Sequence, residues 1–163
     1  MMRFPVRLAA LAAAGLIAAP AGAAQISAVT SVKVVKPVSL TKRRDLDFGT
    51  LAFGGFTGTR TVSLSQAGAL GCATDILCSG APTTARFNVQ GSNRLTILIT
   101  VTGGTMSNGV DSIPFTPDAP PSITPPNSGF PGIDFDVGGS IVLDSALVGG
   151  TYSGTMTVTA DYQ

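Results

Sequence analysis

The residue types that usually carry acid–base catalysis are scarce in this 163-residue sequence. It contains no His, no Glu and no Trp, so Ser-His, Cys-His and His-metal arrangements cannot be built from it. His is the usual general base near neutral pH, and Glu is a common substitute. Only Asp, Lys, Tyr, Ser and two Cys remain. We therefore predict that the protein is not an enzyme and has no catalytic residue, no metal site and no cofactor.

Two carboxylates stand close enough in the sequence to suggest a cation site. Asp134 and Asp136 are two positions apart in a predicted strand, so both side chains project from the same face. Such a pair can contribute to a Ca²⁺ site, which takes about six to eight oxygen ligands. The alternative is the solvated side of a strand whose Ile133, Phe135 and Val137 are buried, and we favour this second interpretation.

The two cysteines, Cys72 and Cys78, lie in a stretch rich in Gly, Ala and Ser. An isolated pair in an exported protein is typical of a disulfide. Zinc needs about four ligands and no further Cys or His is present. The spacing also differs from the C-x-x-C of redox pairs. We predict a disulfide between these two residues.

The N-terminus has the features of a secretory signal peptide. Arg3 and Arg7 precede an apolar run over residues 8–19, and Pro20 and a group of small residues follow. The run is shorter than the roughly 20 residues that span a bilayer. We predict a cleaved signal peptide over residues 1–24 and export to the periplasm, the outer surface or the medium, with no membrane span in the mature chain.

The remaining chain, residues 25–163, has the size of one domain with its own core. Without Arg3 and Arg7, eight basic side chains face nine Asp, so the net charge is about −1. Binding to nucleic acid depends on a basic excess that neutralises phosphates. We therefore expect no nucleic-acid partner.

Alternation of apolar and polar residues dominates after residue 25 and predicts short strands. The strongest pattern covers residues 95–102, where Leu98 also makes the second face apolar and suggests cover on both sides. Seven prolines between Pro114 and Pro131 predict a long irregular loop or an interrupted edge. Together the patterns indicate an all-β fold: a single Ig-like or pilin-like sandwich, mostly antiparallel, with about seven to nine strands.

The two ends of this domain carry the most regular alternation. One face of a predicted first strand, which Pro37 ends, consists of Ile26, Ala28, Thr30, Val32 and Val34. After Gly150, one face of the last strand consists of Met156, Val158, Ala160 and Tyr162. A regular edge strand offers unpaired backbone groups to another chain. The last strand is therefore either an ordinary terminal strand of a sandwich or a site of strand addition.

Three segments resemble known families: Asp-Leu-Asp-Phe-Gly-Thr-Leu at 45–51, Thr-Arg-Thr-Val at 59–62, and Gly-Thr-Tyr-Ser-Gly-Thr at 150–155. Together they look like the bacterial domain of unknown function 4402 family, over most of the mature chain. The same positions have a more distant similarity to spore-coat-U-type pilin domains and chaperone–usher pilus subunits. Gly150 and the penultimate Tyr162 match the C-terminal landmarks of those subunits.

The pilin resemblance implies donor-strand exchange, in which a subunit accepts the N-terminal segment of the next. Ile26, Ala28, Thr30, Val32 and Val34 would be the donor set, and Gly150, Met156, Val158, Ala160 and Tyr162 the C-terminal assembly strand. Partners would be other copies of the chain or a periplasmic chaperone. The expected function is a pilin-like structural or adhesion subunit at the cell surface. The alternative is a self-complete secreted or periplasmic binding module that acts as a monomer, with residues 112–132 as its binding surface.

Overall fold

The computed structural model describes residues 24–163, so the predicted signal peptide lies outside the described residues except for its last position. The chain divides into two units, Met1–Lys33 and Val34–Gln163. In the first unit, residues 24–33 are exposed and form no strand. The predicted strand through Ile26 and Val34 is therefore not formed in this chain. Alternating apolar and polar residues make a segment suitable for a sheet, but a strand forms only where its backbone N–H and C=O groups can bond with a neighbouring strand.

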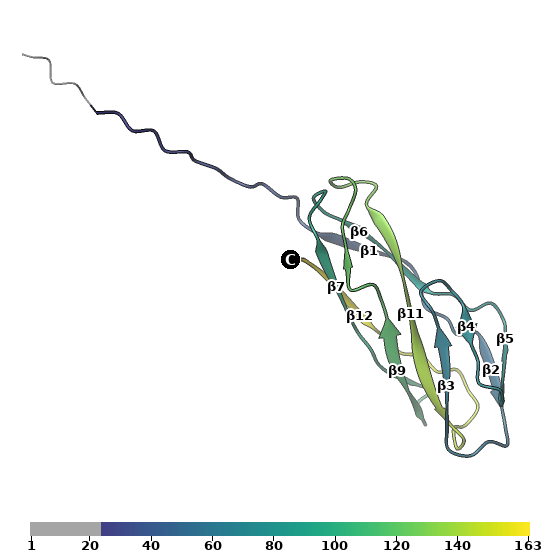
Figure 1. Cartoon of the computed structure of the whole chain (residues 1–163). Coiled ribbons are helices and arrows are strands. Elements are labelled where there is room, and N and C mark those ends of the chain that lie inside the picture. The colour runs from purple at the N-terminus through teal and green to yellow at the C-terminus, as the bar shows by residue number, and fades with distance from the viewer. Residues whose placement is uncertain (1–23) are drawn as a thin grey trace, which may run out of the picture. The chain divides into compact units, whose positions relative to one another are not determined.

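The second unit is an all-β sandwich, coloured from purple to yellow in Figure 1. Its twelve strands are β1 (Ser39–Arg44), β2 (Thr50–Phe53), β3 (Thr59–Leu64), β4 (Leu70–Gly71), β5 (Ile76–Ser79), β6 (Ala85–Gln90), β7 (Ile97–Thr102), β8 (Gly104–Ser107), β9 (Ser112–Asp118), β10 (Ser122–Ile123), β11 (Ile133–Asp144) and β12 (Thr157–Tyr162). All pairings among them are antiparallel. The number exceeds the predicted seven to nine because strands of two to four residues, such as β4, β5, β8 and β10, are too short for a clear periodic signal.

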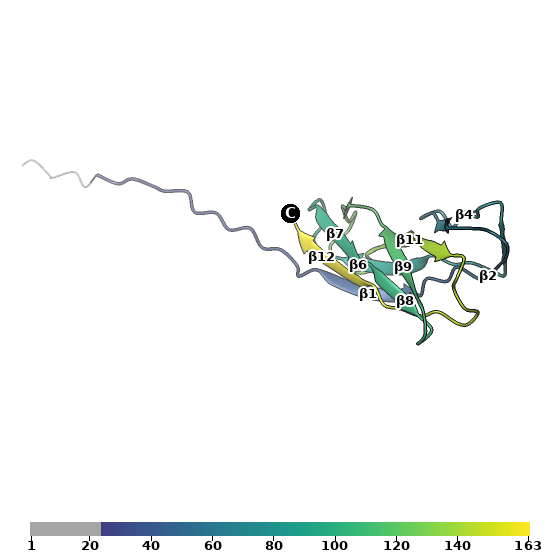
Figure 2. The same ribbon diagram turned by 90° about the horizontal axis from the view of Figure 1, so that it is seen from below.

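The largest sheet has seven strands, in the order β1-β6-β11-β3-β4 with β9 and β8 branching from β11. A second sheet contains β10, β7 and β12, and a third pairs β2 with β5. The disulfide Cys72–Cys78 joins the end of β4 to β5, as predicted. In the second unit, β1 and β12 are thus the first and last strands, and they belong to different sheets (Figure 2).

The core consists of two apolar clusters. One contains Ala85, Phe87, Val89, Ile97, Ile99, Phe135 and Val137, which β6, β7 and β11 contribute between the two larger sheets. The other contains Phe48, Phe56, Val62, Leu64, Ile76, Ile113, Phe115, Ile141 and Leu143. Leu46 and Met156 pack against both clusters. Leu46 lies just after β1, and Met156 lies just before β12.

The long strand β11 changes its partner halfway along. Its first half pairs with β6, and its second half pairs with β3 and β9. The change falls at Gly138 and Gly139, which are buried. A Cβ on Gly138 would overlap the Leu64 carbonyl oxygen, and one on Gly139 would lie 2.5 Å from the Phe115 ring. Glycine is therefore required for β3 and β9 to approach β11 this closely.

Two sequence-based expectations about the strands are wrong. The proline-rich segment is not wholly irregular, because β9 runs from Ser112 to Asp118 through Pro114 and Pro117 and pairs with both β8 and β11. Leu98 is 42% exposed on the outer face of β7, so that strand is not covered on both sides. Isolated apolar residues on a protein surface are common, and alternation alone cannot show whether a second layer covers them.

Candidate strand-binding groove

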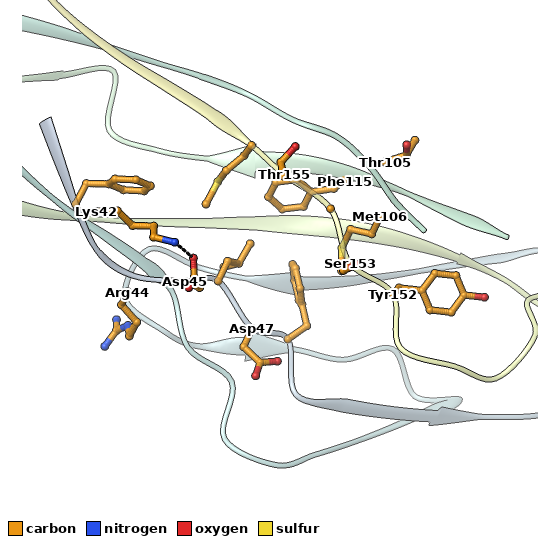
Figure 3. A pocket seen from close by; sticks show the side chains of 15 residues that line it. Lys42, Arg44, Asp45, Asp47, Thr105, Met106, Phe115, Tyr152, Ser153 and Thr155 are labelled. Carbon is orange, nitrogen blue, oxygen red and sulfur yellow. Dashed lines mark hydrogen bonds and ion pairs between the residues drawn. The ribbon is translucent and has the colours of Figure 1, made fainter. Parts of the chain in front are cut away.

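An apolar groove opens between the segment that follows β1 and the segment that precedes β12. Its first part encloses about 470 Å³. One wall is formed by residues 44–48 and the other by residues 152–156. Its floor contains Phe87, Phe115 and Met106 from β6, β9 and β8. Figure 3 shows Phe115 and Met106 between the two walls. The two phenylalanines belong to the two core clusters, so the groove reaches the interior of the sandwich.

A second cavity of about 370 Å³ continues the groove. The two parts share Asp47, Phe48, Met106 and Tyr152. The second part runs between residues 49–53 and residues 147–152, over Ile113, Ile141 and Leu143. We refer to the two cavities together as the groove. It therefore lies mainly over the core cluster that contains Phe48 and Phe115, and it reaches the other cluster at Phe87.

The strands beside the groove are paired on one side only. Among the described residues, β1 pairs with β6 alone and β12 with β7 alone. The predicted inward residues of the last strand are half-buried and pack against the core cluster that contains Phe87 and Phe135: Met156, Val158, Ala160 and Tyr162. Val38 and Leu40 pack against the same cluster. Gly150 lies ahead of β12 and lines the groove. The two free edges offer backbone N–H and C=O groups that a further strand can bond with.

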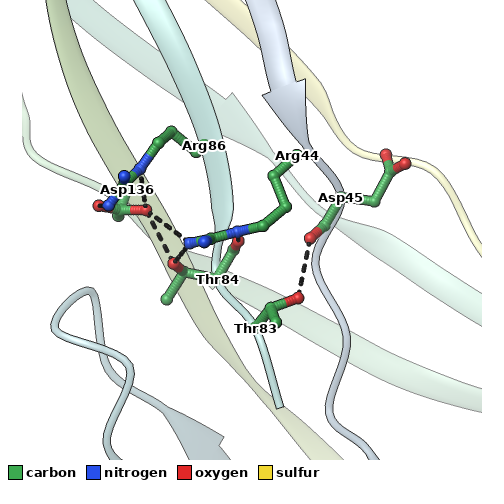
Figure 4. Close-up of polar contacts among 6 residues, drawn as sticks. All are labelled: Arg44, Asp45, Thr83, Thr84, Arg86 and Asp136. Carbon is green, nitrogen blue, oxygen red and sulfur yellow. Dashed lines mark hydrogen bonds and ion pairs between the residues drawn. The ribbon is translucent and has the colours of Figure 1, made fainter. Parts of the chain in front are cut away.

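A bulge and an ion-pair cluster hold the β1 wall of the groove. The register of β1 on β6 shifts between Lys42 and Arg44, and a bulge of this kind bends the strand. The Arg44 guanidinium donates to the Thr84 carbonyl oxygen at 2.7 Å and to Asp136 Oδ1 at 3.1 Å (Figure 4). Arg86 donates to both Asp136 carboxylate oxygens, at 3.0 and 2.7 Å.

These donors also set the protonation of Asp136. The hydrogen bonds from Arg86 lower the pKa of the Asp136 carboxyl, the bond from the Thr84 hydroxyl adds to this effect, and partial burial opposes it. Asp136 in turn raises the pKa of Arg86. A paired carboxylate on the sheet surface stabilises the fold only while it is ionised. The cluster therefore acts as a structural tie between β1, β6 and β11.

Asp134, the second carboxylate of the candidate Ca²⁺ site, has a different hydrogen-bond partner from Asp136. Asp134 accepts a hydrogen bond of 2.6 Å from the Asn88 side-chain amide, which also donates to the Pro131 carbonyl oxygen. Within residues 24–163, no three acidic or Cys side chains gather in a way that could hold a metal ion. The two carboxylates serve different side-chain donors, which is the arrangement of a polar strand face.

Tyr162 lies at one end of the sandwich, where the chain enters β1. Its hydroxyl donates to the Lys36 carbonyl oxygen at 2.6 Å and accepts from the Ser92 backbone N–H at 2.5 Å. The Lys36 backbone N–H donates to Ser92 Oγ at 2.7 Å. One phenol thus joins β12 to the residues before β1 and to those after β6. The resemblance to pilus subunits singled out Tyr162, but the partners of its hydroxyl are far from it in the sequence.

The five predicted donor residues have a different setting. Ile26 is 99% exposed, Val32 85% and Val34 87%, and Ala28 and Thr30 are exposed as well. Val29, on the opposite face of the alternation, is 98% exposed. The walls of the groove were not predicted as a set, because residues 44–53 and 147–156 meet only through the fold.

Fold and groove together define the class: an all-β sandwich domain with an open apolar groove between its first and last strands. A family model described as Domain of unknown function (DUF4402) matches residues 38–162. The chain belongs to this family, as the three sequence segments suggested. Searches among curated proteins and among solved structures found no match. Among the described residues, no helix is long and apolar enough to cross a membrane.

Proposed function

We propose that this chain is an exported, non-catalytic structural or adhesion subunit whose groove accepts a β-strand from another copy of the chain. The single observation that carries the proposal is the groove itself, which lies between residues 44–53 and residues 147–156 and continues toward the unpaired edges of β1 and β12. Core side chains line it, with Phe48 in one wall and Phe87 and Phe115 in the floor. These three side chains are 5%, 7% and 9% exposed, so the groove brings an entering strand into contact with the core itself.

The physical reason is the burial of the entering strand's own apolar side chains, because the side chains of the groove floor are already largely buried. Burial of apolar surface contributes about 25 cal/mol per Å², so a strand that covers the groove is stabilised by each apolar side chain that it inserts. Its backbone can bond with the free edges of both flanking segments, which gives affinity without sequence specificity. Alternate side chains then enter the groove, because successive residues of a strand point to opposite faces.

The chain itself carries a segment of the required kind. Ile26, Ala28, Thr30, Val32 and Val34 alternate over nearly the length of a strand, and all are exposed in the single chain. Exposed apolar residues in such number are typical of an interaction segment. Residues 26–34 of one copy are therefore our choice of donor for the groove of another, with a periplasmic chaperone as a temporary occupant.

Export is supported by the disulfide between Cys72 and Cys78. Disulfides persist in oxidising compartments and are rare in the cytosol. The signal-peptide features of residues 1–24 point to the same route, and assembly then takes place in the periplasm or at the outer surface. The absence of His and Glu from the sequence supports a role without acid–base chemistry.

The test is size-exclusion chromatography with light scattering on the chain that begins at Gln25, with and without an excess of a peptide of residues 25–35. We expect oligomers whose size rises with protein concentration and which the peptide shortens by occupying the groove. A peptide with Asp in place of Val32 and Val34 is the matched control and should leave the oligomers unchanged. A monomer at every concentration that binds neither peptide would overturn the proposal and favour the monomeric binding module.

A further inference from the structure

We propose that Tyr162 keeps the N-terminal segment of each chain out of that chain's own groove, and so leaves the groove to the segment of a second copy. This inference rests on the proposed function and concerns the regulation of the same site. It arises from a geometric problem. The donor segment is joined directly to β1, which flanks the groove, so the nearest donor for every groove belongs to the same chain.

A segment tethered next to its binding site has a large kinetic and entropic advantage. Closing a loop of few residues costs little, and the effective concentration of a short tether is commonly in the millimolar range. Strands joined by a short turn also form the commonest antiparallel pair, the hairpin. Without a specific obstacle, residues 26–34 would turn back beside β1 and fill the groove from within.

The obstacle lies at the point where that turn would have to form. The Tyr162 hydroxyl bonds with the Lys36 carbonyl oxygen and the Ser92 N–H, and Lys36 N–H bonds with Ser92 Oγ. Both backbone groups of Lys36 are therefore engaged. The Lys36 ammonium also donates to the Ser128 carbonyl oxygen at 3.3 Å. We call this set of contacts the Tyr162 latch.

Pro37 strengthens the obstacle through the backbone. Proline restricts the residue before it to extended conformations, so Lys36 is disfavoured at the central positions of a β-turn, where a reversal centred on Val35 and Lys36 would place it. The Tyr162 ring packs in the core cluster between the two larger sheets and is half-buried there. A chain that reversed at residues 34–37 would need to break the latch and pass the ring before its first apolar side chain reached the groove.

A segment from a second copy meets no such requirement. It is not joined to Lys36 of the accepting chain, so it can lie in the groove and end short of the latch. The latch therefore acts on one route only. It raises the free energy of filling the groove from within and leaves filling by a second copy unaffected, which favours assembly over a closed monomer.

The test compares Tyr162→Phe with the unaltered chain beginning at Gln25. Phenylalanine keeps the ring and removes both hydrogen bonds of the hydroxyl. The readout is the rate of trypsin cleavage after Lys33, in samples diluted until light scattering shows monomers only. Lys33 is exposed, and the bond after Lys36 precedes proline and resists trypsin. Tyr152→Phe is the matched control, because its hydroxyl bonds only with the Val148 carbonyl oxygen.

We expect monomeric Tyr162→Phe to be cleaved after Lys33 about fivefold to tenfold more slowly than the unaltered monomer. Loss of the two hydrogen bonds should favour the closed monomer by about that factor, and Lys33 is protected from trypsin in the closed form. Its oligomers should decrease at equal concentration, and Tyr152→Phe should match the unaltered chain in both respects. Ser92→Ala, which removes the bond from Lys36 N–H, should shift both readouts in the same direction and decides the matter if Tyr162→Phe does not fold.

Equal cleavage of the unaltered and Tyr162→Phe monomers, in chains that still assemble, would overturn the latch and leave strand exchange standing. An unaltered chain that neither assembles nor binds the peptide of residues 25–35 would instead overturn the proposed function. Failure of the latch is therefore seen in the Tyr162→Phe monomer, and failure of the proposed function is seen in the unaltered chain.

Discussion

Replacement of Val32 by Ala tests the proposed strand exchange most directly, because the opposite face of the same segment provides a control. In the single chain Val32 is 85% exposed and Val29 is 98% exposed. Both are valines in one short segment without secondary structure. In an extended strand they would lie on opposite faces: Val32 on the same face as Ile26 and Val34, and Val29 on the other face. In a strand, only one of these two faces can enter the groove.

The expected magnitude follows from the side-chain atoms lost. Valine to alanine removes two methyl-sized groups, each worth about 0.8 kcal/mol when transferred from water to an apolar site. Because Val32 is almost fully exposed in the single chain, nearly all of this difference appears on insertion. The donor–groove free energy should weaken by about 1.5 kcal/mol, which is about tenfold in the dissociation constant.

The assay is light scattering across a dilution series of the chain beginning at Gln25. Val32→Ala should raise the concentration at half-assembly about tenfold, and Val29→Ala should change it by less than about twofold. Equal effects of the two substitutions would refute the reasoning, because they would show that no strand with a defined inward face forms. A larger effect of Val29→Ala would show that the opposite face enters the groove.

Three further predictions concern the domain itself. Leu143→Ala, at a side chain that is 1% exposed, should lower the free energy of unfolding by about 2–5 kcal/mol in urea titrations, whereas Leu98→Ala on the exposed face of β7 should cost less than about 1 kcal/mol. Hydrogen bonds from Arg86 and Thr84 lower the pKa of Asp136 in the folded protein. The contribution of the ionised Asp136 carboxylate to stability is therefore present above the pKa of about 4 that Asp has in the unfolded chain, and it is lost as the pH falls below that value. Thermal unfolding of Asp136→Asn should therefore depend less on pH between about 5 and 2, and an unchanged slope would contradict the role of the cluster. Replacing both Cys72 and Cys78 by Ser should lower stability by about 2 kcal/mol, since the disulfide closes a short loop; an equal loss in the reduced unaltered chain would confirm the cause.

Strand positions were predictable wherever one face is buried and the other is polar. Ile97 and Ile99 of β7 are buried, as the alternation over residues 95–102 indicated. Prolines misled the prediction at β9, because strand pairing depends on which backbone N–H groups face a neighbour and not on composition. The predicted strand that buries Ile133, Phe135 and Val137 is only the first half of β11, since Gly138 and Gly139 interrupt the apolar pattern at the point where the partners of β11 change.

The sequence by itself determined the all-β class, the family, the disulfide and the unusual features of both ends of the domain. These properties depend on residue type and on local period, which any single segment displays. The groove was decided only by tertiary structure, because its walls come from residues 44–53 and 147–156 and its floor from β6, β8, β9 and β11. The same is true of Tyr162, whose hydroxyl bonds with Lys36 and Ser92. Contacts between residues so distant along the chain are set by the pairing of strands, and no local pattern in a sequence encodes them.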